Sequence, residues 1–298
     1  MEAVLEEFYA QIVDKLERDE LIPAYKRTQY REYVAIVVEG LCGPWCGQDK
    51  RKACEAAILG AVTHHNRAVC ANGSVCPLGK HHDILYVMAR LALDAKAGPG
   101  PVSTLLNAIY KCEKTLEKLF EGAVVGSKVA RMISGRRTDF GATAAENRQA
   151  MAFFLDRVTR TRLLLDGQRP ADVKMGSYRA SPVVVATAAG DVDAVALLLR
   201  YGAADTSVRA AIAYLRDTAD THRPLSAGSR SCLEILRRAT LYEDSYHSKY
   251  LKVLQPPALM HLARHVVRHT LYANFNLPHG IRQLPIPQSL VSYLNLEC

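Results

Sequence analysis

The chain has 298 residues, 49% of them hydrophobic and 23% charged, with 18 Gly and 13 Pro. This is the composition of a folded protein of one large or two modest domains, and it excludes a collagen-like, low-complexity or disordered chain. Lys and Arg number 38 against 30 Asp and Glu, so the formal net charge of +8 favours acidic partners without by itself indicating nucleic acid.

Neither a secretory signal nor a membrane span is expected. Residues 1–20 are acidic and amphipathic, whereas a signal peptide has a basic stretch followed by an apolar run. The most apolar window, residues 183–199, contains Asp191 and Asp193. We therefore expect an intracellular protein, in the cytoplasm and with the nucleus left open, and no membrane partner. Its eight cysteines are then expected to be reduced thiols.

Helical periodicity runs along the whole chain, and the alternation typical of β-strands is nearly absent. We predict helices over residues 4–16, 30–41, 53–62, 84–93, 102–120, 145–165 and 192–201. Gly, Pro and polar residues predict loops at 98–101, 135–137 and 217–230. The pattern indicates an all-α fold of paired helices, for which internal repeats are the first thing to examine.

One helix pair stands out at residues 179–207. Ser181 is placed to cap its first helix, and Pro182 lies in the first turn, where a missing N–H needs no partner. Ala186 is small enough for two helices to pack closely, and Gly190 can form the turn between them.

The second helix of this pair buries a stripe that includes Leu198 and Leu199, and Gly202 ends it in a left-handed conformation. The segment resembles an ankyrin repeat, although Val183 and Val184 replace the Leu and His that the motif prefers. The resemblance implies that these small, capping and stripe residues are structural: Ser181, Pro182, Ala186, Gly190, Leu198, Leu199 and Gly202.

Weaker copies of this pattern are expected on both sides, because one repeat cannot bury both of its faces. Residues 103–123 fit with one position missing, and residues 158–167 resemble a second helix that ends at Gly167. Residues 208–215 and 231–236 fit a helix pair split by an insertion. For each copy, an unrelated helical hairpin is the alternative.

The segment after Pro256 contains an amphipathic helix. One face carries the apolar residues Leu259, Leu262, Ala263, Val266 and Val267 together with Thr270, and the other carries Arg264, His265, Arg268 and His269. Alone, this pattern predicts a terminal helix that docks its apolar face on the chain's own core. Leu284-Pro285-Ile286-Pro287 and a closing Leu-x-x-Tyr-Leu at residues 290–294 follow it.

Residues 256–294 resemble a SOCS box, the module by which substrate receptors join elongin B/C and a cullin. The resemblance implies an elongin-binding helix face formed by Leu259, Leu262, Ala263, Val266 and Val267, and cullin-binding residues Leu284, Pro285, Ile286 and Pro287. A helix of this spacing fits a groove, with Leu259 as anchor, and a Pro-rich segment loses little entropy on binding. Ala263 replaces a commoner Cys, which we expect to weaken elongin binding modestly.

An ankyrin unit followed by a SOCS box resembles the ankyrin repeat and SOCS box family. The fold implied is an all-α, degenerate ankyrin-repeat helical array followed by a C-terminal three-helix SOCS box. Residues 1–100 would be an unassigned helical region or eroded repeats, residues 101–250 the ankyrin-like repeats and residues 256–298 the SOCS box.

The family implies a non-enzymatic role: the substrate receptor of an elongin B/C ubiquitin ligase built on cullin-5 and its RING protein, which brings an unidentified target protein to be ubiquitinated. The competing interpretation is an ankyrin scaffold whose terminal helix only caps the repeats. A third and weaker one is a zinc-containing nucleic-acid-binding protein. No phosphate-binding loop or catalytic grouping is present, so we expect no cofactor.

Cysteines and histidines gather in residues 42–82. The set comprises Cys42, Cys46, Cys54, Cys70, Cys76, His81 and His82. Three residues separate Cys42 from Cys46, which does not fit a thioredoxin motif, and no zinc knuckle is repeated. We interpret the set as scattered reduced thiols, with zinc as the alternative and no metal site assigned. The pairs at 64–65 and 81–82 are interpreted as solvated loop histidines.

Basic residues gather at two places, Lys128, Arg131, Arg136 and Arg137, and then Arg157, Arg160 and Arg162. We interpret both clusters first as solvated faces and second as docking patches for an acidic protein. Nucleic-acid contacts come third, because no aromatic residues are interleaved with the basic ones.

Overall fold

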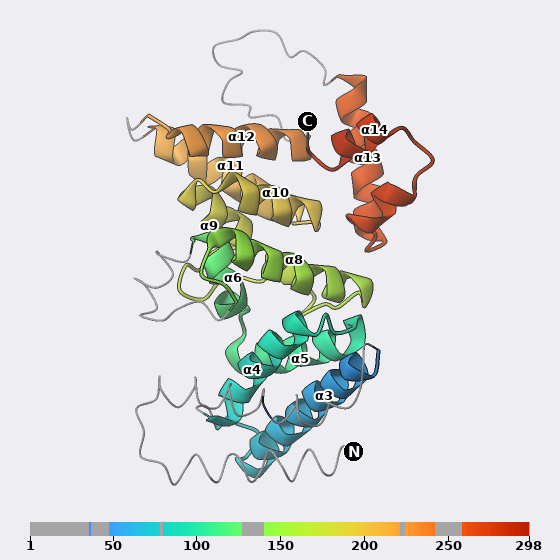
Figure 1. Cartoon of the computed structure of the whole chain (residues 1–298). Helices are drawn as coiled ribbons and strands as arrows, with labels where there is room; N and C mark the ends of the chain where they lie inside the picture. Colours follow the sequence, from blue (N-terminus) through green and yellow to red (C-terminus); the bar gives the residue numbers. More distant parts are fainter. Residues whose placement is uncertain are drawn as a thin grey trace. The chain divides into compact units, whose positions relative to one another are not determined.

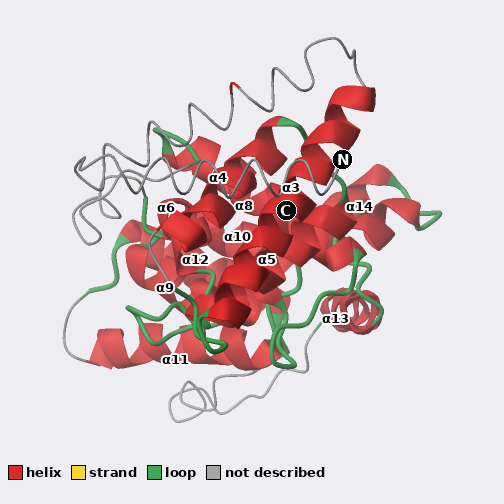
Figure 2. Cartoon of the chain, turned by 90° about the horizontal axis from the view of Figure 1, so that it is seen from below, coloured by secondary structure: helices red, strands yellow, loops and turns green. Residues whose placement is uncertain are grey.

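A computed structural model describes residue 36 and residues 48–77, 80–126, 140–220, 224–241 and 258–297. Over these ranges the chain forms helices and loops with two isolated bridges, and Figure 2 shows no strand in this part. The prediction of an all-α fold is therefore confirmed for the described residues. Apart from residue 36, the predicted helices at 4–16 and 30–41 and the loop at 135–137 lie outside them.

None of the described helices combines the length and the apolar character needed to cross a bilayer. The chain divides into two compact units, Met1–Leu116 and Glu117–Cys298.

In the first unit, three helices pack against one another: α3 (Gln48–Ala71), α4 (Lys80–Asp94) and α5 (Pro99–Glu113). All three contribute fully buried side chains to a common core, among them Ile58, Leu85, Met88, Leu105 and Ile109. The helices expected at 53–62 and 84–93 are present as parts of α3 and α4.

The stretch 98–101, predicted as a loop, begins α5 instead. Pro99 occupies the first turn, and the N–H of Gly98 donates to Glu55 Oε1 at 2.7 Å. The helix ends where Lys114 adopts φ 56°. This left-handed residue splits the helix predicted at 102–120 into two.

The second unit begins with helices arranged in two rows. The first row contains α6 (Glu117–Val124), α9 (Pro182–Ala189) and α11 (Asp205–Asp220). The second contains α8 (Ala144–Arg160), α10 (Val192–Arg200) and α12 (Ala227–Ala239). Helices of one row contact partners in the other, so α6–α8, α9–α10 and α11–α12 form successive packed pairs (Figure 1). A 3-10 turn, Pro170–Asp172, lies between the first two pairs.

The α9–α10 pair confirms most of the local predictions for residues 179–207. Pro182 lies in the first turn, Gly190 and Gly202 are left-handed with φ +69° and +80°, and Ala186, Leu198 and Leu199 are buried. The expected cap by Ser181 is wrong: this residue holds the N-cap position, but its hydroxyl is buried without a hydrogen bond. Asp191 does cap α10, accepting from the N–H of Ala194 at 3.0 Å.

The flanking copies fit less closely. Helix α8 begins with a capping box of Thr143 and Glu146 and ends at Arg160, so the helix predicted at 145–165 is too long. Gly167 does not end a helix; it lies with φ +79° in the turn between Leu165 and Gln168. The pair expected from residues 208–215 and 231–236 is present as α11 and α12, and the latter starts inside the predicted loop at 217–230.

The chain ends in a small helical module formed by α13 (Leu259–Ala273), a 3-10 turn (His279–Gln283) and α14 (Gln288–Leu294). Its core consists of buried Leu277, Ile281, Val291 and Leu294. A three-helix module was predicted, and its middle helix is the 3-10 turn.

Candidate functional site

Helix α13 runs past the C-terminal ends of α8, α10 and α12 (Figure 1), and one of its two buried arginines, Arg268, donates a hydrogen bond to α10. Its Nη2 donates to the carbonyl of Leu199, in the last turn of α10, at 2.6 Å. Its Nη1 donates to the carbonyl of Leu294 in α14 at 2.7 Å. The last carbonyls of a helix lack intrahelical donors and carry partial negative charge, so a guanidinium satisfies both needs.

A second side chain of α13 binds the end of α12 in the same way. His261 Nε2 donates to the carbonyl of Thr240, which follows α12, at 3.1 Å. Arg264 Nη2 donates to His261 Nδ1 at 2.9 Å, and its guanidinium lies 4.2 Å from the ring centroid of Tyr293. Burial, followed by repulsion from Arg264 and Arg200, lowers the pKa of Arg268 to about 10, which leaves it charged at neutral pH.

Arg169 connects the loop after α8 to the module. Its guanidinium is 3.7 Å from the ring centroid of Tyr272 and 3.9 Å from that of Phe275, and it donates to the carbonyl of Tyr272. Gly202 lies against the same ring, because a Cβ at this position would be 3.0 Å from Cδ2 of Tyr272. Cation–π stacking and a close backbone approach thus hold the module on the helical pairs.

A contact between His279 and Asp156 completes the attachment. His279 Nε2 lies 2.9 Å from Asp156 Oδ1, and Arg160 donates to the same carboxylate at 3.1 Å. Burial alone would raise the pKa of Asp156, but the hydrogen bonds and charges of His279 and Arg160 outweigh it and hold that pKa well below its usual range.

Arg264 and Arg268 are buried, whereas much of the apolar face of α13 is turned outward. Leu259 is 82% exposed, Val266 61% and Met260 57%, and Ala263 is exposed as well. The interpretation of α13 as a helix that docks its apolar face on the chain's own core is therefore wrong. An outward leucine and valine two turns apart on one side of the helix form a surface suited to a partner.

Two members of the predicted elongin-binding face lie elsewhere. Val267 packs against the core of the terminal module, and Leu262 is half-buried. Met260, which sequence reasoning missed, is exposed beside Leu259. The only indication of this role in the sequence was that Met260 is adjacent to Leu259 in the first turn of the helix.

In the predicted cullin-binding segment, the aliphatic side chains and the prolines face in different directions. Leu284 and Ile286 are half-buried and pack against the module core, whereas Pro285 and Pro287 are exposed. The aliphatic residues thus hold the segment in place, while the two prolines face solvent together with Leu290, which is 41% exposed.

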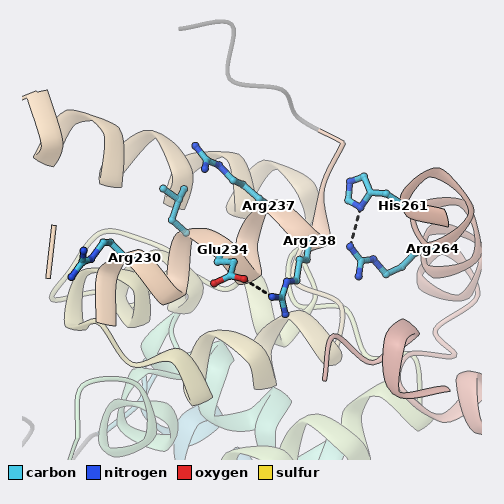
Figure 3. A pocket seen from close by; sticks show the side chains of 7 residues that line it. Arg230, Glu234, Arg237, Arg238, His261 and Arg264 are labelled. Carbon is cyan, nitrogen blue, oxygen red and sulfur yellow. Dashed lines mark hydrogen bonds and ion pairs between the residues drawn. The ribbon is translucent and has the colours of Figure 1, made fainter. Parts of the chain in front are cut away.

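A groove of about 440 Å³ lies between α12 and α13 (Figure 3). Arg230, Leu233, Glu234, Arg237, Arg238, His261 and Arg264 line it. Glu234 pairs with Arg238 and His261 accepts from Arg264, as the dashed lines show. The four arginines make the groove basic, which suits carboxylate or phosphate groups.

The earlier candidates in residues 42–82 are spread over several places. Cys42 and Cys46 lie outside the described residues, Cys54 is buried in α3 and Cys70 is exposed near its end. The interpretation of both His pairs as solvated loop residues is wrong, because His65 and His82 lie in helices and are 1% and 3% exposed.

The first basic cluster, between residues 128 and 137, also lies outside the described residues. In the second basic cluster, Arg157 and Arg160 both form salt bridges with Asp156, so this carboxylate offsets part of their positive charge.

A comparison with protein-family models matches residues 255–295 to the SOCS box. The match covers the terminal module and confirms that part of the sequence prediction, whereas no ankyrin-repeat model matches. Searches of curated proteins and of solved structures return no match. SOCS boxes are typical of substrate receptors of elongin B/C–cullin ubiquitin ligases, and they bind elongin B/C and the cullin–RING machinery.

Proposed function

We propose that this chain is a non-catalytic substrate receptor of a ubiquitin ligase formed by elongin B/C, cullin-5 and its RING protein. The observation that carries the proposal is the outward apolar face of α13, which lies in the segment matched to the SOCS box. A chain folded for its own stability alone would bury such a face, because each fully buried large aliphatic side chain contributes about 1.5–3 kcal/mol.

In this proposal, elongin B/C binds the outward face of α13 by accepting the helix in a groove. Leu259 is the anchor, Met260 extends the apolar surface beside it, and Ala263 allows close approach one turn later. Val266 continues the contact along the same face. Val267 contributes indirectly, by fixing α13 to the module core.

The cullin contact is assigned to the exposed rings of Pro285 and Pro287. Both sit in a segment whose backbone is fixed before binding, because Leu284 and Ile286 anchor it and Pro287 holds the N-cap position of α14. Preorganisation of this kind reduces the conformational entropy lost on association. The specificity for cullin-5 follows from the family resemblance.

The stacked helical pairs are proposed to be a degenerate ankyrin-type array within residues 101–250 that binds the target protein, with the SOCS box at 256–298 and residues 1–100 unassigned. The observed two-row arrangement and the left-handed Gly190 and Gly202 support this assignment. Binding two partners on one chain raises the local concentration of target near the ligase. The proposal sets this activity inside the cell, in the cytoplasm and with the nucleus left open.

The test is co-expression of the full chain with tagged elongin B/C, followed by co-purification. Leu259→Asp is expected to abolish capture, because it places a charge at the anchor. Leu164→Asp is the matched control, since Leu164 is also an exposed leucine, at 47%, but lies outside the terminal module. Retained capture by Leu259→Asp, or equal loss in both variants, contradicts the proposal.

A second pair of variants separates the two contacts. Pro285→Ala combined with Pro287→Ala is expected to keep elongin and lose cullin-5. Deletion of residues 256–298 separates the receptor from a plain scaffold: a receptor keeps its target and loses the ligase, whereas a scaffold loses its solubility or its target.

A further inference from the structure

The first unit contains a cluster of four side chains of the types that bind metals, and the proposed ligase function does not involve them. His65 comes from α3, Cys76 from the loop after it, His82 from α4 and Cys112 from α5. One potential ligand atom from each residue lies within 4.8 Å of all the others. The four positions are thus brought together by the packing of α3, α4 and α5.

The distances between ligand atoms fit a tetrahedral ion. His65 Nε2 lies 3.5 Å from Cys76 Sγ and 3.4 Å from Cys112 Sγ. His82 Nδ1 lies 3.6 Å from Cys76 Sγ. With Zn–S about 2.3 Å and Zn–N about 2.0–2.1 Å, tetrahedral geometry places sulfur and nitrogen about 3.6 Å apart. The folded chain therefore spaces these atoms as zinc requires.

A carboxylate orients one of the histidines. Glu113 Oε1 lies 2.7 Å from His82 Nε2, and its other oxygen accepts from the hydroxyl of Tyr86 at 2.8 Å. A carboxylate at Nε2 favours the tautomer with its proton on that nitrogen, which leaves the lone pair of Nδ1 directed at the cluster. This is the carboxylate–histidine–metal arrangement common around zinc sites.

The second histidine is also placed as a ligand. His65 is 1% exposed, so its ring is enclosed by the packed helices. Its Nε2 is the atom that lies near both cysteine sulfurs, and an imidazole nitrogen is a common metal ligand.

We propose that His65, Cys76, His82 and Cys112 bind one Zn²⁺ ion. Two sulfur and two nitrogen ligands in tetrahedral spacing favour zinc among the common divalent metals. Four protein ligands leave no open coordination position, so the site is structural rather than catalytic. The ion joins α3, α4 and α5, and this role is independent of the ligase function proposed above.

The decisive measurement is the zinc content of the purified full-length chain by inductively coupled plasma mass spectrometry. About one zinc per chain is expected, and Cys76→Ser and Cys112→Ser should each reduce it at least about tenfold. Cys70→Ser is the matched control, an exposed cysteine in α3 outside the cluster, and His64→Asn is the corresponding histidine control next to His65. Both controls should keep their zinc.

A second measurement keeps the test valid if the ligand variants fail to fold. Co²⁺ exchanged into the wild-type chain should show the visible bands of tetrahedral cobalt and a thiolate-to-cobalt charge-transfer band of two-sulfur intensity. Glu113→Gln, which leaves all four ligands in place, should weaken metal affinity by about 10–100-fold.

Four results would overturn the site. They are a wild-type chain that neither contains zinc nor acquires the cobalt spectrum, zinc that persists in Cys112→Ser, zinc that is lost equally from the controls, and a disulfide between Cys76 and Cys112 detected by mass spectrometry of the chain purified under reducing conditions.

Discussion

Arg268 of α13 donates to the carbonyl of Leu199 at the end of α10, over 2.6 Å, and this contact determines which way the last long helix faces. Leu199 also accepts from the N–H of Gly202, which closes the helix end. Since the arginine needs buried carbonyl acceptors, its face of α13 turns toward the helical pairs. The apolar face is left to the solvent and, in our proposal, to elongin B/C.

Replacing Arg268 by Met keeps much of the side-chain volume but removes both hydrogen bonds. Hydrogen bonds from charged groups contribute about 1.5–3 kcal/mol each, so we expect Arg268→Met to lower the free energy of unfolding by about 2–4 kcal/mol. Urea unfolding of the full chain measures this change. Arg209→Met is the control: Arg209 forms an exposed pair with Asp205, and its loss should change stability by less than about 1 kcal/mol. Equal effects of the two substitutions would contradict the assigned role.

Gly202 allows a separation of backbone strain from steric contact. Gly202→Ala combines a residue at φ +80° with a Cβ 3.0 Å from the Tyr272 ring. Gly167→Ala has nearly the same φ, +79°, but no atom within 4 Å of its Cβ. Both substitutions should lower the free energy of unfolding by about 1 kcal/mol through backbone strain. Gly202→Ala should lower it by about 1 kcal/mol more, because its Cβ meets the Tyr272 ring. Identical melting temperatures for the two variants would show that the ring moves aside freely.

The pairing of Asp156 with His279 predicts a dependence on pH. Since the pKa of Asp156 is held below its unfolded value near 3.8, the pair contributes stability that is fully present above that value and is lost as the pH falls below it. The stability difference between wild type and Asp156→Asn should therefore shrink as the pH falls below about pH 4. Urea unfolding at each pH measures it, and a difference that grows in acid would contradict the pairing.

The terminal module was predictable from sequence because its signals are local. An amphipathic helix and the Leu284-Pro285-Ile286-Pro287 segment lie close together in the chain, and the SOCS box match covers both. The helical pair at 179–207 was predictable for the same reason, since Gly190 and Gly202 impose their own backbone conformations.

The orientation of α13 could not be predicted, because amphipathic spacing shows that two faces differ but not which of them is buried. An apolar face is normally the inner one; here the end of α10, about 70 residues earlier in the chain, supplies acceptors for Arg268. Those acceptors exist only after folding.

The cluster in the first unit was predicted only in part, for a related reason: the set for which zinc was the alternative held Cys76 and His82 but neither His65 nor Cys112. Sequence reasoning sought pairs of closely spaced cysteines, whereas the four side chains come from positions 65, 76, 82 and 112. Cys112 lay beyond the segment considered, and His65 had no nearby partner in sequence. Helix packing, which the sequence pattern does not specify in detail, brings them together.

The most direct test of the central claim compares two properties of one variant, Val266→Asp, which changes the outward face of α13. The measurement is the dissociation constant for purified elongin B/C by titration calorimetry, together with the melting temperature of the free chain. We predict binding weakened at least about tenfold, equivalent to about 1.4 kcal/mol, with the melting temperature nearly unchanged. Unchanged affinity would contradict the proposed function. A lowered melting temperature in the absence of elongin would also contradict it, because it would show that this face serves the chain's own fold.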